Sequence, residues 1–596
     1  MSEHAFFTRL AQVFNSGQSR SVILSGNIHD LFDAGSEYLP LIPFLCRKSA
    51  APGIVQLVYE LNGPIRVASE KGRVALQDAW VAWKAGVELD TLIVQDMTKR
   101  QKRVEQLRAD FDRHMQEAIG NPTLALEFLR QLMICSRATL RENLLVLVEA
   151  ADMLLPVAAG GDVAGLSDRQ LRRVSIVQDW FGDPAFLHGG DSVCLIAESR
   201  HLIHPRVARM PQVLSVEVPA PSLEARERYI NHYIETARIK PTLWSTPRSL
   251  AESTAGLSIH AIRQLLAGAA HAGEPLAPDG VIDKVEQYVQ SQLGEDVVEF
   301  KRPTHKLDSV VGFSRLKRFF RDELIPRFQA KGKKSLAGAA VAGPIGSGKT
   351  FVFEAMAAEL GLPVLVLKNI RSQWYGQTDV IFERLRRVLE ALDKVVLFVD
   401  EADTQFGGVD ATAHETERRL TGKIQAMMSD PALRGRVAWL LMTARIHLLS
   451  PDIRRPGRVG DLIIPVLDPE GDDRREFVRW VLGEAIAAPT DEDVAALDGL
   501  TEGYSAAAFA SLRSHLAAAK DDDGDMPIER VASLVRDHIP PAIGPTRRYQ
   551  ELQALVNCTR RSLLPGSDAD GFDLDASRKQ WQNELHHLET QGERGA

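Results

Sequence analysis

The chain has 596 residues, enough for several domains of roughly 100–200 residues each. Hydrophobic residues make up 45% of it and charged residues 25%, a balance that excludes a disordered or fibrous protein. The 71 Lys and Arg residues against 79 Asp and Glu residues leave a net charge of −8, so the overall charge does not favour nucleic acid or anionic lipid as a partner.

The cysteines and the first residues favour a cytoplasmic location. The four cysteines are far apart, without the short paired spacing of a zinc site or a dense disulfide framework. Glu3 stands where a secretory signal would carry a basic residue, and the apolar residues between Phe6 and Phe14 have the spacing of a packed amphipathic helix. No apolar run reaches the length of about 18 residues that a membrane-spanning helix needs. We therefore expect a reducing, cytoplasmic environment and no membrane span.

Strand-like apolar runs alternate with longer helical patterns through both halves of the chain. This alternation predicts an α/β fold with a mainly parallel sheet in each half. In the first half, residues 22–27, 144–148 and 193–197 have the strand pattern. The predicted organisation is a first module at 1–295, a linker at 296–307, a large α/β subdomain at 308–469, an Ala-rich helical subdomain at 470–540 and a polar helical tail at 541–596, partly disordered at its end.

The second half has a regular series of expected elements. A strand and a Gly-rich turn are expected at 338–348, followed by a helix at 349–360. Further strands are expected at 364–367, 395–399 and 437–443, with a helix at 379–392 between the first two of them.

The most specific motif is the Gly-rich turn between the first of these strands and its helix. It reads G-x-x-x-x-G-K-T in full, and the flanking strand and helix argue against a chance Gly-rich turn. Small residues let backbone N–H groups surround phosphates, Lys349 neutralises the β and γ oxygens, and Thr350 places a hydroxyl on Mg²⁺ at a helix N-terminus. The residues of this candidate ATP site are Gly343, Pro344, Ile345, Gly346, Ser347, Gly348, Lys349 and Thr350.

Two carboxylates, those of Asp400 and Glu401, follow the apolar strand at 395–399. The carboxyl end of a strand is where ligands bind in open α/β sheets. We expect Asp400 to hold Mg²⁺ through its water shell and Glu401 to polarise the water that attacks the γ-phosphate. Acids in this place can instead cap the next helix, but their combination with the phosphate loop favours a catalytic role.

From Asp308 to about Pro540 the sequence resembles an ATPase module of the AAA family, because several motifs occur in the family's order. The resemblance implies a P-loop AAA+ fold with a helical lid, ATP and Mg²⁺ as ligands, and assembly into a homo-oligomeric ring, a hexamer. Within the segment that begins at Asp308, Val311 and Gly312 match the family's contacts with adenine.

The segment from Ser450 to Arg458 resembles the family's second region of homology, whose arginines reach the γ-phosphate bound by the neighbouring subunit. By this resemblance Arg455 and Arg458 are arginine fingers that act in trans. A guanidinium is a fixed, permanently charged fork, which suits it to phosphoryl transfer. The alternative is that these are solvated surface arginines beside a Pro-Gly turn.

Trp374, Tyr375 and Gly376 stand where the family has its first pore loop. Adjacent aromatic residues beside a glycine suit a ring of side chains that grip a translocating polypeptide by apolar contact. The two aromatic residues could instead belong to the core or to a subunit interface.

Two positions depart from the family's pattern. The strand at 437–443 matches the sensor strand, but Ala444 stands where the family has an Asn that would orient the attacking water. Thr443 offers a neighbouring hydroxyl that can partly replace it. In the stretch 503–507, which resembles a Gly-x-Ser-Gly-Ala motif of the lid, Ala506 replaces Gly.

Residues 1–295 resemble a degenerate copy of the same module. The strand at 144–148 can be laid beside the acidic strand of the second half, which puts Ala150 at the position of Glu401. No Gly-Lys-Thr follows the strand at 22–27, so tight ATP binding by this half is not expected. The alternative is an unrelated α/β domain whose strands match by chance. In either case partner recognition or ring stabilisation is the natural role of this half.

The resulting hypothesis is an ATP-driven machine for remodelling protein substrates, an unfoldase or disassembly chaperone that pulls polypeptide through its pore. The alternative is a slow ATP-dependent switch or assembly scaffold whose first half binds partners, and Ala444 favours that version. The acidic balance and the lack of a basic stretch interleaved with aromatic residues count against a nucleic-acid motor. No H-E-x-x-H motif occurs, which argues against a fused metalloprotease.

Overall fold

The computed structural model describes most of the chain. The described residues are 4–88, 98–158, 165–294, 297–330, 334–368, 378–392, 394–406, 415–455, 457–520, 525–539, 543–569 and 571–591. The chain divides into two compact units, one made mainly of Met1–Tyr288 and the other mainly of residues from Val289 onward, and each contains a six-stranded sheet. Among the described residues, no helix is long and apolar enough to cross a membrane.

The sheet of the first unit is parallel except at one edge. Its strand order is β5-β4-β6-β7-β1-β8, and β5 runs antiparallel to β4. Alternate side chains of β1 enter two cores, Ile23 on one face and Val22 and Leu24 on the other. The strands are β1 (Ser21–Gly26), β4 (Ile54–Tyr59), β5 (Ile65–Val67), β6 (Asn143–Val148), β7 (Ser192–Ala197) and β8 (Val213–Val218), with a separate hairpin of β2 (Leu31–Asp33) and β3 (Tyr38–Pro40).

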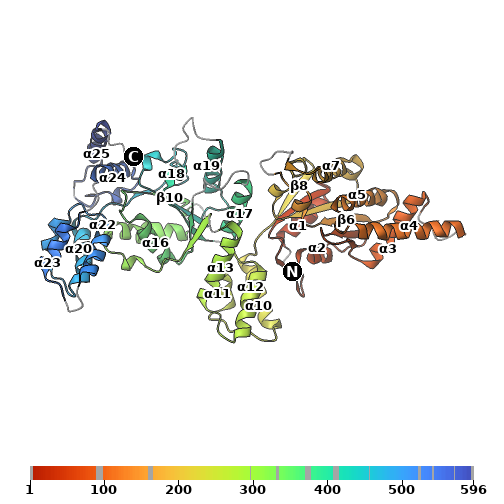
Figure 1. Ribbon diagram of the computed structural model, residues 1–596, viewed down its shortest axis with the longest axis horizontal. Coiled ribbons are helices and arrows are strands. Elements are labelled where there is room, and N and C mark those ends of the chain that lie inside the picture. Colours follow the sequence, from red (N-terminus) through yellow and green to blue (C-terminus); the bar gives the residue numbers. More distant parts are fainter. Residues whose placement is uncertain are drawn as a thin grey trace. The chain divides into compact units, whose positions relative to one another are not determined.

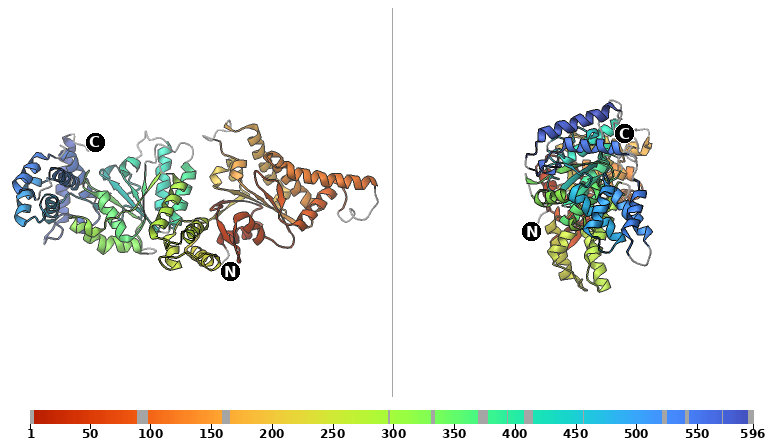
Figure 2. Two further views of the ribbon diagram at one scale, coloured as in Figure 1. Left: turned by 60° about the horizontal axis from the view of Figure 1, so that its bottom comes forward. Right: turned by 90° about the vertical axis from the view of Figure 1, so that its left-hand side faces the viewer.

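Helices cover both faces of this sheet (Figure 1, Figure 2). The core on one face includes α1 and α2, and the core on the other includes α3, α4, α5 and α7. The helices are α1 (Ala5–Asn15), α2 (Leu41–Lys48), α3 (Glu70–Ala85), α4 (Thr98–Glu117), α5 (Pro122–Thr139), α6 (Ala151–Leu154), α7 (Asp168–Gly182), α8 (Pro184–Leu187), α9 (Pro205–Ala208), α10 (Leu223–Thr236), α11 (Pro247–Ser253), α12 (Ile259–Ala272) and α13 (Pro278–Leu293).

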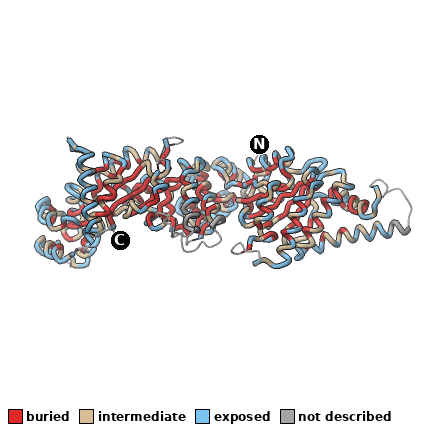
Figure 3. Tube along the Cα trace, turned by 90° about the horizontal axis from the view of Figure 1, so that it is seen from above, coloured by how far each residue is buried: buried red, intermediate tan, exposed pale blue. Residues whose placement is uncertain are grey.

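The sheet of the second unit has the order β14-β10-β13-β12-β11-β9, with β9 antiparallel to β11. Its strands are mostly buried, and Figure 3 shows buried residues, in red, inside each unit with exposed residues around them. The strands are β9 (Val298–Lys301), β10 (Gly338–Ala342), β11 (Val364–Leu367), β12 (Val395–Val399), β13 (Val437–Thr443) and β14 (Ile463–Pro465). The two sheets have the same strand order when each is followed from its antiparallel edge strand. The order is β5, β4, β6, β7, β1, β8 in the first unit. It is β9, β11, β12, β13, β10, β14 in the second, so that β1 corresponds to β10 and β6 to β12.

The helices of the second half include four that form the helical subdomain, α20 to α23, and two at the C-terminal end. They are α14 (Ser314–Phe319), α15 (Ile325–Gln329), α16 (Lys349–Leu360), α17 (Thr378–Ala391), α18 (Ala402–Phe406), α19 (Glu415–Met428), α20 (Gly471–Ala485), α21 (Asp491–Asp498), α22 (Ala506–Ala519), α23 (Ile528–Asp537), α24 (Gly544–Asn557) and α25 (Leu574–Thr590), with a π-helical turn at Phe320–Leu324.

The predicted fold class is confirmed in both halves: two mainly parallel α/β sheets, the second followed by a helical subdomain. The strands β11, β12 and β13 and the helix α16 form with the expected bounds. Near the N-terminus, α1 is the expected amphipathic helix, with Phe6, Leu10 and Val13 buried.

Two expectations about segments need correction. The predicted linker at 296–307 contains β9, because Val298 and Phe300 are buried, alternate with polar residues and pair with β11. The expected polar helical tail at 541–596 is helical, with α24 and α25, but these helices pack into the second unit. Leu552 and Leu555 of α24 are at most 2% exposed, so this helix belongs to the core.

In the first unit, a buried carboxylate joins the loop after β1 to the distant helix α12. Asp30 is 2% exposed and accepts hydrogen bonds from the N–H groups of Ile259 at 3.0 Å and His260 at 2.9 Å, in the first turn of that helix. It also accepts from Leu31 N–H and Asn27 Nδ2, each at 2.8 Å. A helix N-terminus has N–H groups without intrahelical partners, so this carboxylate ties the helical group to the sheet.

We expect Asp30→Ala to destabilise the contact between the sheet and α12 by about 3 kcal/mol, because each buried N–H group left without an acceptor costs roughly 1–3 kcal/mol. Amide hydrogen exchange of residues 258–266 in the full chain measures the effect as faster exchange. Asp33→Ala is the control, since Asp33, the last residue of β2, accepts from the N–H group of Gly35, which lies outside α12. Equal exchange in the two variants would contradict this role of Asp30.

Candidate nucleotide-binding site

The Gly-rich loop lies between β10 and the start of α16, as the motif predicts. Its conformation requires glycine at three places. Gly346 and Gly348 have φ angles of 79° and 87°, in the left-handed region that favours glycine. A Cβ atom at Gly343 would collide with the carbonyl oxygen of Val466, next to β14. The loop is therefore shaped by close backbone contact with the neighbouring strand.

Lys349 reaches back over this loop. Its Nζ donates hydrogen bonds to the carbonyls of Gly343 and Pro344, each at 2.9 Å. Burial lowers the pKa of Lys349 to about 8, while the carboxylates of Asp400 and Asp468 act in the opposite direction. The ammonium is thus a buried cation that is poorly solvated by the protein alone, which favours binding of an anion beside it.

Two hydroxyl residues complete the loop. Ser347 is fully buried, and its Oγ has no hydrogen-bond partner within the described part of the chain. Thr350 lies in the first turn of α16 and lines the cavity. An unpaired buried hydroxyl, a buried ammonium and a helix N-terminus at one place fit a phosphate group well.

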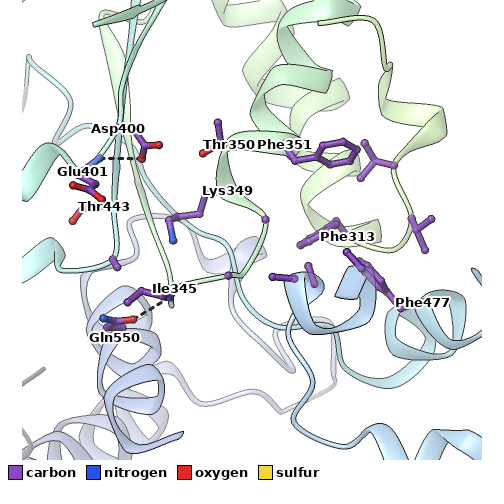
Figure 4. Close-up of a pocket in the computed structure, with 18 of the residues that line it drawn as sticks. Phe313, Ile345, Lys349, Thr350, Phe351, Asp400, Glu401, Thr443, Phe477 and Gln550 are labelled. Atoms are coloured by element: carbon purple, nitrogen blue, oxygen red, sulfur yellow. Dashed lines mark hydrogen bonds between the residues drawn. The ribbon is translucent and has the colours of Figure 1, made fainter. Parts of the chain in front are cut away.

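The acidic side of the site follows β12. Asp400 and Glu401 are both exposed in the cavity, and the carboxylate of Asp400 accepts the N–H group of Glu401 at 2.9 Å (Figure 4). Glu401 has a φ of 47°, which is unusual for a residue with a side chain. Ala150, which the sequence aligns with Glu401, has a φ of 50° after β6, so both sheets make the same turn at this point.

Thr443, expected to replace the missing Asn, is occupied by other contacts. Its Oγ1 donates to Asp403 Oδ1 at 2.6 Å and accepts the N–H group of Arg445 at 2.8 Å. Arg445 Nε in turn donates to Asp403 Oδ2 at 2.7 Å. The Thr443 hydroxyl therefore positions a buried carboxylate, and its only proton is not directed at the cavity. Ala444 lines the cavity and offers no polar side chain.

One cavity of about 810 Å³ is lined by the phosphate loop, by Asp400 and Glu401, and by an apolar wall. The apolar wall has Val311 at its margin and three aromatic residues, Phe313, Phe477 and Trp480. The rings of Phe313 and Phe477 meet edge to face at 5.8 Å, and those of Phe477 and Trp480 at 6.1 Å. Figure 4 shows Phe313 and Phe477 on one side of the loop and Asp400 and Glu401 on the other. This division fits a ligand with an aromatic base and a phosphate chain.

Gly312, expected beside Val311, stands just outside this wall. Its N–H group donates to Glu476 Oε2 at 3.1 Å, and a Cβ atom there would collide with the ring of Phe477. The glycine thus permits the close approach of this segment to α20.

The predicted arginine fingers do not line the cavity of their own chain. Arg455 has 72% of its side chain exposed and pairs with Asp452 at 3.1 Å. Arg458 donates to Ser429 Oγ at 3.1 Å and to the carbonyl of Asp452 at 2.6 Å. The predicted pore-loop residues Trp374, Tyr375 and Gly376 lie outside the described residues.

Sequence reasoning missed several residues of the site. Phe477 and Trp480 come from α20 and look like ordinary core positions of an amphipathic helix. Gln550 and Arg547 come from α24, in the segment expected to be a tail, and both bond to Ile345 of the phosphate loop. No local pattern could identify them, because their role depends on a contact across about two hundred residues, 205 for Gln550.

Three segments of the chain match known family models. Residues 339–465 match the family of ATPases associated with various cellular activities (AAA). Residues 3–219 match the N-terminal Rossmann-like domain of AAA+ chaperones, and residues 224–294 match their second helical domain. Residues 339–465 are thus similar to the AAA family of ATPases, and the two segments before them are similar to domains of AAA+ chaperones.

Curated relatives agree with this family but are longer. The Cell division cycle protein 48 homolog of Archaeoglobus fulgidus is 29% identical over 30% of this chain and 24% of that protein. Protein SAV of Sulfolobus acidocaldarius is 28% identical over 32% of this chain and 24% of that protein. The ATPase family gene 2 protein homolog A of Homo sapiens is 28% identical over 30% of this chain and 20% of that protein. The match thus spans about a quarter of the length of these relatives.

The lowered pKa of Lys349 predicts a loss of nucleotide affinity at high pH. Only the charged ammonium attracts phosphate, and with a pKa of about 8 its charged fraction falls roughly tenfold between pH 7 and pH 9. We expect the Kd for ADP, measured by calorimetry, to rise by roughly tenfold over that range. The control is Lys349→Arg, whose guanidinium stays charged, so that its Kd remains constant whatever its value at pH 7. A constant Kd in the wild type would contradict the prediction.

The aromatic wall predicts a separate contribution from the base. Trp480→Ala removes one ring of that wall, and we expect the Kd for ADP to rise by roughly fivefold, the effect of a lost aromatic contact. Inorganic tripolyphosphate has no base, so its binding to the same variant should be unchanged. If Trp480→Ala raises the Kd for ADP and the Kd for tripolyphosphate by the same factor, the ring acts on the phosphate loop rather than on a base.

Proposed function

We propose that this chain binds and hydrolyses ATP at the cavity in its second unit. The observation that carries the proposal is that a complete phosphate loop and a pair of carboxylates, Asp400 and Glu401, line the same cavity. Phosphoryl transfer is catalysed chiefly by positioning and charge neutralisation, and this cavity supplies both. The match of residues 339–465 to the AAA family of ATPases supports the same activity.

Each residue has a role that its position allows. Lys349 neutralises the β- and γ-phosphate oxygens, and the N–H groups at the start of α16 bind them. Thr350 and Asp400 are the residues that would hold Mg²⁺, which supplies further neutralisation of phosphate charge when bound. Glu401 accepts a proton from the attacking water. Val311, Phe313 and Trp480 hold the base against the apolar wall.

The active form that we propose is a homo-oligomeric ring, a hexamer. Arg455 and Arg458 are outside the cavity of their own chain, and the exposure of Arg455 leaves it free to reach a neighbouring subunit. A guanidinium supplied in trans stabilises charge on the transferring phosphoryl group. In this arrangement hydrolysis requires assembly.

The work done by this ring is remodelling of a protein substrate. The chaperone-type domains that match the first unit support this role, as does the position of Trp374 and Tyr375 in the sequence. Aromatic side chains at a pore can hold many polypeptide sequences by apolar contact.

The alternative function is a slow ATP-dependent switch or assembly scaffold. The contacts of Thr443 favour it, because this hydroxyl donates to Asp403 and Ala444 provides no group to orient water. A site that lacks one group for orienting water hydrolyses ATP more slowly but binds ATP with the same affinity. The two functions share the site and differ in what hydrolysis achieves.

The first test measures ATPase rate against protein concentration for the wild type, Glu401→Gln and Arg455→Ala. We expect specific activity to rise with concentration in the wild type and to fall by roughly a hundredfold or more in Glu401→Gln, which keeps the shape of the side chain but loses the base. Glu401→Gln should still bind ATP. Mixing it with Arg455→Ala should restore part of the activity, because the mixed ring contains subunit boundaries with both groups intact. Full activity in either single variant would contradict the proposed roles.

The second test separates remodelling from switching. We expect the double substitution Trp374→Ala and Tyr375→Ala to abolish unfolding of a tagged model protein while the ATPase rate stays within about twofold of the wild type, because the aromatic pair grips the substrate and does not touch the nucleotide. Normal unfolding by the double variant would favour the switch or scaffold.

A further inference from the structure

Helix α24 contacts the phosphate loop through two side chains on one of its faces. Gln550 Oε1 accepts a hydrogen bond from the N–H group of Ile345 at 3.0 Å (Figure 4). Arg547 Nε donates to the carbonyl of the same residue at 2.9 Å. Both polar backbone groups of Ile345 are therefore bonded to one helix that follows the lid in sequence.

Arg547 is itself held firmly. Its Nη2 donates to both carboxylate oxygens of Asp468, at 2.6 and 2.7 Å, and only 15% of its side chain is exposed. Asp468 lies shortly after β14, the strand beside the phosphate-loop strand β10. The guanidinium thus joins three parts of the second unit: the end of a strand, the loop and α24. A planar fork with fixed donors is suited to such a position.

At Ile345 the loop depends on these contacts more than on packing. Ile345 is 52% exposed, so burial does not hold this residue in place. Its carbonyl accepts from Arg547, and the next carbonyl, of Gly346, accepts from the N–H group of Ala507 at 3.0 Å. A carbonyl oxygen that faced a phosphate would repel it, so fixing these oxygens on protein donors keeps the loop able to bind an anion.

We propose that Arg547 and Gln550 are positioning residues that hold the phosphate loop in its nucleotide-binding conformation, so that nucleotide affinity depends on helix α24. This inference rests on the nucleotide binding proposed above and adds a structural element outside the matched ATPase segment, which ends at residue 465. Coupling between two sites is reciprocal, so a bound nucleotide also stabilises α24.

The same helix supplies matched controls. Arg548, beside Arg547, bonds to Glu584 of α25 at 2.7 and 2.9 Å and does not touch the loop. Gln553, one turn beyond Gln550, is 8% exposed and donates to Tyr549 at 3.1 Å. Substitutions of Arg548 and Gln553 disturb the packing of α24 and leave its contacts with Ile345 in place.

The experiment compares Arg547→Met with Arg548→Met and Gln550→Met with Gln553→Met in the full chain. Methionine has a similar length and cannot replace these hydrogen bonds. We expect the Kd for ADP to rise by roughly fivefold in each loop variant and to stay within about twofold of the wild type in each control. At saturating ATP, kcat should stay within about twofold of the wild type in the two control variants, because their side chains touch neither the loop nor Asp400 and Glu401.

A second readout tests the reciprocal effect. We expect ADP to slow amide exchange of residues 544–557 in the wild type and in both controls, and to have no such effect in the Arg547→Met, Gln550→Met double variant. Equal changes of Kd in loop and control variants, or an unchanged Kd in the loop variants, would overturn the inference. A wild type that binds no nucleotide overturns both this inference and the proposed function. The expected pattern of Kd values in a protein that hydrolyses no ATP supports the inference and overturns only the hydrolysis.

Discussion

A loop that binds phosphate must keep its carbonyl oxygens on protein donors, because a free carbonyl beside an anion is repulsive. The second unit meets this requirement with donors from three directions. Lys349 bonds the first two carbonyls, Arg547 bonds that of Ile345, and the backbone of Ala507 in the lid bonds that of Gly346. The conformation of this one short turn therefore depends on donors from helix α16, the lid helix α22 and the C-terminal helix α24.

Charged groups outside the phosphate loop affect the charge of Lys349. Burial lowers the pKa of Lys349, and Asp400 and Asp468 partly oppose that effect. Burial raises the pKa of Asp468 to about 6, with Arg547 acting against the shift. Burial thus makes the charged forms of Lys349 and Asp468 less stable than they would be in water. A phosphate group bound beside Lys349 would relieve the cation, which is why the geometry favours an anionic ligand.

The parts of the site that could be predicted from sequence are those whose signal is local. The phosphate loop, the acids after β12 and the bounds of β11 to β13 depend on residues that are neighbours in the chain. The base-binding wall and the α24 contacts could not be predicted, because Trp480 and Gln550 have no local pattern that separates them from core or surface positions. β9 was missed for a related reason: four alternating residues in a charged segment are too short a signal. The role of Thr443 also needed the structure, since its bond to Asp403 crosses 40 residues.

A comparison of the two units shows which features belong to the shared fold and which serve the chemistry of the nucleotide site. Its strand order matches that of the second unit, and Ala150 makes the left-handed turn that Glu401 makes. That turn therefore belongs to the architecture of the sheet and is not in itself a sign of catalysis. The contact between the loop after the corresponding strand and the helical group differs: in the first unit the carboxylate of Asp30 accepts from the first turn of α12, whereas in the second unit the carbonyl of Gly346 accepts from Ala507 in the first turn of α22. In the first unit a carboxylate of the chain already occupies this position, whereas the phosphate loop of the second unit contains Lys349 and no carboxylate. This contrast supports a division in which the first unit is structural and the second responds to nucleotide.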